Sequence, residues 1–151
     1  MYENLTPAAR IVRRAFFFGV KKMTDCEILT LVERLENCSL APTDFHHRDH
    51  LTVAVAYLYS AELDRALDKM RTSLLRFVAY HGGNRYHETA TRFWMLAAEK
   101  HLDRGLCLQH AVERVTSALA DKNLIYQYYS REKLHSVEAK NGWVEPDVPR
   151  P

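Results

Sequence analysis

The chain has 151 residues, of which 47% are hydrophobic, and its formal net charge is +2. A chain of this length buries roughly 70% of the surface that its unfolded form exposes, which is enough for one domain with its own core. Three cysteines without a CxxC motif argue against a disulfide framework and favour a reducing, cytoplasmic setting. Apolar runs stay well short of the ~18 residues that a membrane span needs, and acids are interleaved with the cations. The composition therefore predicts no membrane insertion and no nucleic-acid binding.

The first 22 residues differ from the others in their charge. They contain five lysines and arginines against one acid, a net charge of +4, which leaves −2 for residues 23–151. Just after this segment, Thr24 and Glu27 have the spacing of a capping box, which marks the start of a helix. We therefore interpret residues 1–22 as a basic N-terminal extension or arm, and residues 23–151 as a single domain.

The hydrophobic pattern is helical along almost the whole chain. Pro42 disfavours helical geometry at the residue before it, and Gly82 and Gly83 stand where a helix commonly ends. Three prolines after Trp143 predict an extended C-terminal strap that Trp143 anchors. We predict an all-α fold, a single bundle of about six or seven helices with a Pro-rich strap. The helices are expected at about 8–20, 24–37, 43–59, 61–81, 86–102, 104–120 and 121–129, with one further turn at 136–141.

The most informative side chains are histidines on apolar helix faces. His47 and His50 share one face of the third expected helix, and His87 opens the fifth. An imidazole on such a face loses its water and needs hydrogen-bond partners or a metal ion. In an up-down bundle the third and fifth helices start at the end where the fourth stops, so His81 arrives there too. The sequence thus predicts a polar pocket inside the bundle.

Three neutral imidazoles with a carboxylate and one open position are typical of a catalytic metal site. We predict His47, His50 and His87 as ligands, with Glu36, near the end of the second helix, as a further ligand. Glu88 is predicted as the general base or fourth ligand. This donor set suits a divalent transition metal, iron or zinc first and nickel or manganese next.

Further residues are candidates for handling a substrate near this site. His81 is a second candidate catalytic residue, although a histidine at a helix C-terminus is also simply favoured by the helix dipole. The candidates for lining a substrate cavity are Tyr57, Tyr86, Thr91 and Trp94. For each of these aromatic residues the alternative interpretation is ordinary core packing. For each histidine the alternative is a hydrogen-bonded position in the core.

Four segments resemble a family of small, mostly bacterial, uncharacterised helical proteins. The family pattern is an aromatic-x-His-x-x-His-Leu segment, a Tyr-His-Glu-Thr segment and a Pro-Asp tail. The resemblance covers residues 23–151 and implies that His47, His50, His87 and Glu88 are the recurring positions, but it assigns no activity. The matching segments are Glu36-Asn37-Cys38-Ser39-Leu40, Phe45-His46-His47-Arg48-Asp49-His50-Leu51, Tyr86-His87-Glu88-Thr89 and Trp143-Val144-Glu145-Pro146-Asp147.

These observations predict a small cytoplasmic metal-binding protein that acts on a small molecule. The expected activity is that of a metal-dependent oxidoreductase, hydrolase or lyase with a three-histidine plus glutamate site. One alternative is a non-catalytic interaction or regulatory module whose histidines form a structural hydrogen-bond cluster. Another is a metal-free enzyme that uses histidine and glutamate as acid and base. A homodimer is compatible with all three.

Overall fold

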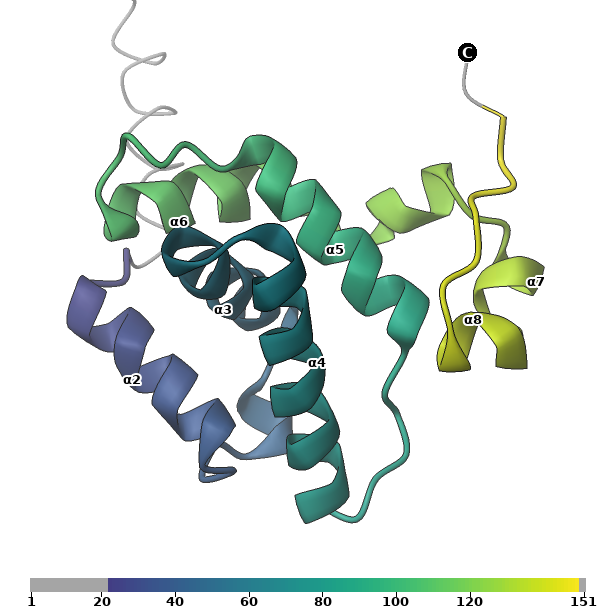
Figure 1. The fold of residues 1–151 in the computed structure, drawn as a ribbon, viewed down its shortest axis with the longest axis horizontal. Coiled ribbons are helices and arrows are strands. Elements are labelled where there is room, and N and C mark those ends of the chain that lie inside the picture. Colours follow the sequence, from purple (N-terminus) through teal and green to yellow (C-terminus); the bar gives the residue numbers. More distant parts are fainter. Residues whose placement is uncertain (1–21, 150–151) are drawn as a thin grey trace, which may run out of the picture.

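The computed structural model describes residues 22–149, and the helix expected at 8–20 lies outside them. Within the described range every regular element is a helix, which confirms the all-α bundle (Figure 1). No helix of this range combines the length and the apolar content needed to cross a membrane. In chain order the elements are α2 (Asp25–Glu36), η1 (Pro42–Asp44), α3 (His47–Ser60), α4 (Leu63–Tyr80), α5 (Glu88–His101), α6 (Leu108–Ala118), η2 (Lys122–Gln127), α7 (Arg131–Leu134) and α8 (Val137–Asn141).

Helix α3 is the central element of the bundle. It packs against α2, α4, α5 and α6, which surround it (Figure 1). The sequence predicts one apolar stripe on this helix, but its residues 51–55 are buried without a break. A helix enclosed on all sides has no solvent face to supply an amphipathic period. Its first turn, which carries His47 and His50, is only half-buried.

Helix boundaries follow local signals in most places. Thr24 and Glu27 form the expected capping box at the start of α2. Gly82, with a φ of +71°, reverses the chain just after α4, a conformation that costs glycine little. The third helix starts later than expected: Pro42 begins a short 3₁₀ turn instead, and α3 opens behind His46, whose N–H donates to Asp49 at 2.9 Å.

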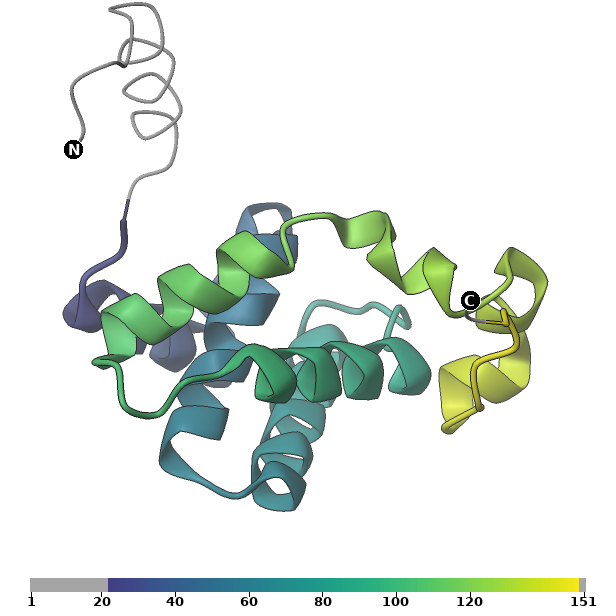
Figure 2. The same cartoon turned by 90° about the horizontal axis from the view of Figure 1, so that it is seen from above.

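The C-terminal elements form a separate layer on α5. Figure 2 shows η2, α7 and α8 gathered at one end of the molecule, where α8 packs on α5. The extended strap is confirmed: Thr89, fully buried on α5, donates to Gly142 O (2.7 Å) and accepts from Val144 N (3.2 Å). The buried Tyr129 donates to Val144 O as well, and Trp143 packs edge-on against its ring. This layer fixes the N-terminal half of α5, which carries His87 and Glu88.

Candidate functional site

A cavity of about 640 Å³ lies between the start of α3, the end of α4 and the start of α5. His47, His50, His81 and His87 all line it, and we call it the histidine cavity. The structure thus brings together the four histidines that the up-down topology places at one end of the bundle. Most of the wall is apolar, and its main apolar side chains are Phe45, Ala54, Met70, Leu74, Phe77 and Trp94.

His47 is tied to the end of another helix. Its Nε2 lies 2.8 Å from the carbonyl oxygen of Leu119, the residue that follows α6. A carbonyl only accepts, so Nε2 carries the ring hydrogen and satisfies one of the carbonyls that a helix end leaves unpaired. Trp94 meets the imidazole edge-on, with the ring centroids 4.5 Å apart. One nitrogen of His47 is therefore committed to structure.

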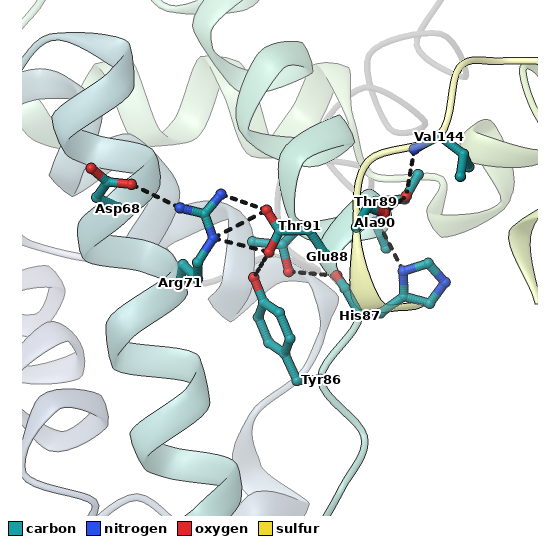
Figure 3. Close-up of polar contacts among 10 residues, drawn as sticks. Asp68, Arg71, Tyr86, His87, Glu88, Thr89, Ala90, Thr91 and Val144 are labelled. Atoms are coloured by element: carbon teal, nitrogen blue, oxygen red, sulfur yellow. Dashed lines mark hydrogen bonds and ion pairs between the residues drawn. The ribbon is translucent and has the colours of Figure 1, made fainter. Parts of the chain in front are cut away.

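His87 uses both of its ring nitrogens for structure. Its Nδ1 accepts the backbone N–H of Ala90 at 3.1 Å, which makes His87 the N-cap of α5 (Figure 3). Its Nε2 donates to the carbonyl oxygen of Leu134, the last residue of α7, at 2.7 Å. The ring is therefore a neutral Nε2–H tautomer with no lone pair left for a metal in this arrangement.

The ring of His50, in contrast to that of His87, makes no hydrogen bond within residues 22–149. Its ring stacks on Phe45 with a centroid separation of 3.9 Å, and no residue of the described range hydrogen-bonds to either nitrogen. Burial is the main cause that lowers its pKa from the ordinary 6.5 to about 4, with a smaller contribution from His47. Asp49 acts in the opposite direction. His50 is thus a neutral imidazole in the cavity wall near pH 7.

Glu88 points away from the histidines and into an ion-paired network. Arg71 on α4 reaches both carboxylate oxygens through its Nε, at 3.0 and 3.1 Å, and Oε1 again through Nη2. The Tyr86 hydroxyl donates to Oε2, and Asp68 holds the far side of the guanidinium at 2.7 Å (Figure 3). The Arg71 guanidinium is the main cause that holds the pKa of Glu88 below its usual value.

Glu36 and Tyr57 form a separate polar group away from the histidine cavity. The Tyr57 hydroxyl donates to Glu36 at 2.9 Å and lies 2.9 Å from the Ser73 hydroxyl, and Lys69 pairs with the same carboxylate at 3.6 Å. Burial raises the pKa of Tyr57, chiefly because the phenolate would lose its hydration. Neither Glu36 nor Tyr57 lines the cavity, so the structure does not bring these two predicted residues to the site.

The other predicted substrate contacts do line the histidine cavity, namely Tyr86, Thr91 and Trp94. Sequence reasoning missed two cations in the same wall, Arg85 and Lys122. Arg85 follows the Gly82–Gly83 turn, and Lys122 follows the Asp121 cap of η2, so both stand beside recognisable chain reversals. Their position in a common wall depends on loop packing, which leaves no periodic signal in the sequence.

Within residues 22–149, no group of three or more histidine, cysteine or acidic side chains is arranged to hold a metal ion. Among the histidines that line the cavity, His50, His81 and the second nitrogen of His47 have no hydrogen-bond partner within residues 22–149. The three-histidine plus glutamate site and the catalytic role of Glu88 stay predictions. What the arrangement offers chemically is an apolar cavity with a hydrogen-bonding imidazole and cations in its wall.

Comparison of the chain with protein-family models, with curated proteins and with solved structures gave no match. The resemblance to a family of small helical proteins therefore stays a prediction.

Proposed function

We propose that the histidine cavity is the binding site for a small organic molecule, with His50 as its principal hydrogen-bonding group. The observation that carries this proposal is a neutral imidazole in an apolar wall without a partner among the described residues. The His50 ring is half-buried and lines the cavity, so a ligand there can supply the hydrogen bond that the described residues do not. The stack on Phe45 fixes the plane of the ring before any ligand arrives.

The form of the cavity supports the same proposal. Its volume of about 640 Å³ falls within the range of roughly 300–1,000 Å³ that is typical of small-molecule sites. Such sites combine apolar walls with a few convergent polar groups. Here the polar groups come from the first turns of α3 and α5, and both turns are locked by hydrogen bonds of His47 and His87 to other helices. The site is therefore preorganised, which lowers the cost of binding.

Filling the cavity is expected to abolish binding. Val78 on α4 is half-buried in the cavity wall, so Val78→Trp places an indole where the ligand would lie. Small aromatic and aliphatic fragments that bind the wild-type protein are first identified by ligand-observed NMR. We expect their affinity for Val78→Trp to be about tenfold or more weaker than for the wild-type protein. Thr72→Trp, on an exposed position of the same helix outside the cavity, is the matched control and should keep the fragments.

Circular dichroism of both variants checks that α4 is intact, and Ala90→Leu obstructs the same cavity from α5 with a smaller side chain. Fragments that bind equally well to wild-type protein, Val78→Trp and Ala90→Leu would place their site elsewhere and contradict the proposal.

A metal-dependent enzyme is the second candidate, favoured by one observation. His47 and His50 lie one turn apart in the cavity wall, and the described residues leave a nitrogen of each without a partner. Two such imidazoles suit iron or zinc, with water or the bound molecule completing the coordination. An ion held there would polarise a ligand or activate a water molecule.

This candidate predicts about one equivalent of metal per chain in untagged protein purified without chelator and supplied with zinc or ferrous iron. The measurement is elemental analysis by mass spectrometry. His47→Ala combined with His50→Ala should lose the metal, whereas His87→Ala should retain it, because both nitrogens of His87 are already engaged. His110→Ala, at an exposed position of α6, controls for nonspecific binding. Protein that stays metal-free after this treatment excludes the second candidate.

A further inference from the structure

Two cations in the wall of the histidine cavity have no assigned role. Arg85 comes from the segment between α4 and α5, and Lys122 from the start of η2, so they reach the cavity from separate parts of the chain. Neither side chain has a hydrogen-bond or ion-pair partner within residues 22–149. Arg71 shows the contrast, because its guanidinium is engaged by Glu88 and Asp68. Arg85 and Lys122 are thus cations without a protein counter-charge in the described structure.

No aspartate or glutamate of residues 22–149 lines this cavity. Glu88 is close in sequence, but it lines a different pocket, where Arg71 and Tyr86 hold its carboxylate. Asp49 also stays outside the lining and accepts the backbone N–H of His46 at 2.9 Å. Arg85 and Lys122 are both exposed, so solvent and salt screen their charges, but a lining with cations and without acids still gives the cavity a positive potential.

The helix ends around the cavity carry both signs, with the positive ends in the majority. First-turn residues of α3 and α5, among them His47 and Thr91, line the cavity with two positive dipole ends, whereas the last turn of α4, with Phe77, brings one negative end. Phe77 and Trp94 also line the cavity and give its wall flat apolar surface that suits an aromatic or alkyl group.

We infer that the ligand of the histidine cavity is an organic acid. Its apolar body packs against Phe77 and Trp94, and its carboxylate or phosphate group pairs with Arg85 and Lys122. This inference rests on the proposed binding function and names the chemical class that the function serves.

Three probes of nearly the same shape test the charge preference: 2-naphthylacetate, 2-naphthylacetamide and 2-(2-naphthyl)ethylamine, which are anionic, neutral and cationic at pH 7. Dissociation constants are measured by titration of the full chain at low ionic strength, where screening is weak. We expect the acid to bind about tenfold more tightly than the amide, and the amine to bind most weakly. The double variant Arg85→Gln/Lys122→Gln should bind the acid only as tightly as it binds the amide.

The matched control is Arg65→Gln/Lys100→Gln, which removes the same charge from exposed positions outside the cavity. It should change the affinity of the acid less than about twofold. An amide that binds as tightly as the acid, or an acid that binds equally well to Arg85→Gln/Lys122→Gln, overturns the organic-acid inference and leaves the binding function standing. If no probe binds, or if all bind unchanged to Val78→Trp, the proposed function falls together with the inference.

Discussion

Replacing His50 by glutamine is expected to make the stability of the protein less sensitive to acid. The pKa of His50 falls from 6.5 in an ordinary environment to about 4 in the folded protein, chiefly through burial. Between pH 6.5 and pH 4 this histidine is protonated in the unfolded chain but neutral in the folded protein. Its contribution to the free energy of unfolding is therefore complete above pH 6.5 and is lost as the pH falls towards 4. Down to pH 4.5 this loss amounts to about 2–3 kcal/mol for His50.

The measurement is urea unfolding at a series of pH values for wild-type protein and for His50→Gln. Glutamine keeps a polar group in the cavity wall but cannot take up the proton. Between pH 6.5 and pH 4.5 the free energy of unfolding of His50→Gln should therefore fall by about 2–3 kcal/mol less than that of the wild-type protein. His110→Gln gives the effect of losing an exposed histidine on α6. Identical pH dependence in wild-type protein and His50→Gln would show that folding does not lower the pKa of His50.

The sequence predicts the helices of this protein well because their boundaries depend on local chemistry. The capping box of Thr24 and the reversal at Gly82 act over three or four residues, so a pattern in the sequence can reveal them. Helix α7 spans only Arg131–Leu134 and is too short to show a hydrophobic period, which is why the sequence analysis misses it.

The convergence of the histidines could also be predicted, because it depends only on the alternating direction of neighbouring helices. Their hydrogen bonds could not. His47 finds the carbonyl of Leu119 and His87 that of Leu134, and both carbonyls belong to helix ends far along the chain. Helical periodicity places an imidazole on a face, but it does not say which helix end meets that face. The sequence therefore predicts a pocket, whereas the protonation state of each ring needs the structure.

The partner of Glu88 illustrates the same limit for charges. Glu88 and Arg71 lie 17 residues apart, on α5 and α4, and they meet because the Gly82–Gly83 turn brings α5 back along α4. The sequence marks Glu88 as a carboxylate beside a histidine and thereby suggests a catalytic role. The contact with Arg71 depends on the rotation of both helices about their axes, which tertiary packing sets.

The ion pair between Arg71 and Glu88 is expected to be a major stabilising contact between α4 and α5. The Glu88 side chain is only 13% exposed, whereas Arg71 is 32% exposed and has Asp68 as a second partner. Arg71→Met leaves a nearly buried carboxylate without its cation, so we expect a loss of about 2–4 kcal/mol in the free energy of unfolding near pH 7. Glu88→Gln removes the charge itself and should cost less, about 1–2 kcal/mol.

The coupling energy between the two side chains is obtained by unfolding in guanidinium chloride of the single variants and of the double variant Arg71→Met/Glu88→Gln. The double variant should lose less than the two single losses added together, since neither change then strands a buried charge. Asp68→Asn is the matched control, because Asp68 is 76% exposed and its pair with Arg71 is worth less than about 1 kcal/mol. Equal losses for Arg71→Met and Asp68→Asn would contradict the assignment.

The pH dependence of this contact has a definite sign. The Arg71 guanidinium lowers the pKa of Glu88, so the stabilisation is complete above the ordinary glutamate pKa of 4.5 and disappears as the pH falls and the folded protein takes up the proton. Wild-type protein and Glu88→Gln should therefore converge in stability at low pH and differ most near neutrality. The stabilisation from neutral His50 is lost at higher pH than the stabilisation from ionised Glu88. Stability measured against pH for His50→Gln and Glu88→Gln therefore distinguishes the contribution of the cavity histidine from that of the ion pair between α4 and α5.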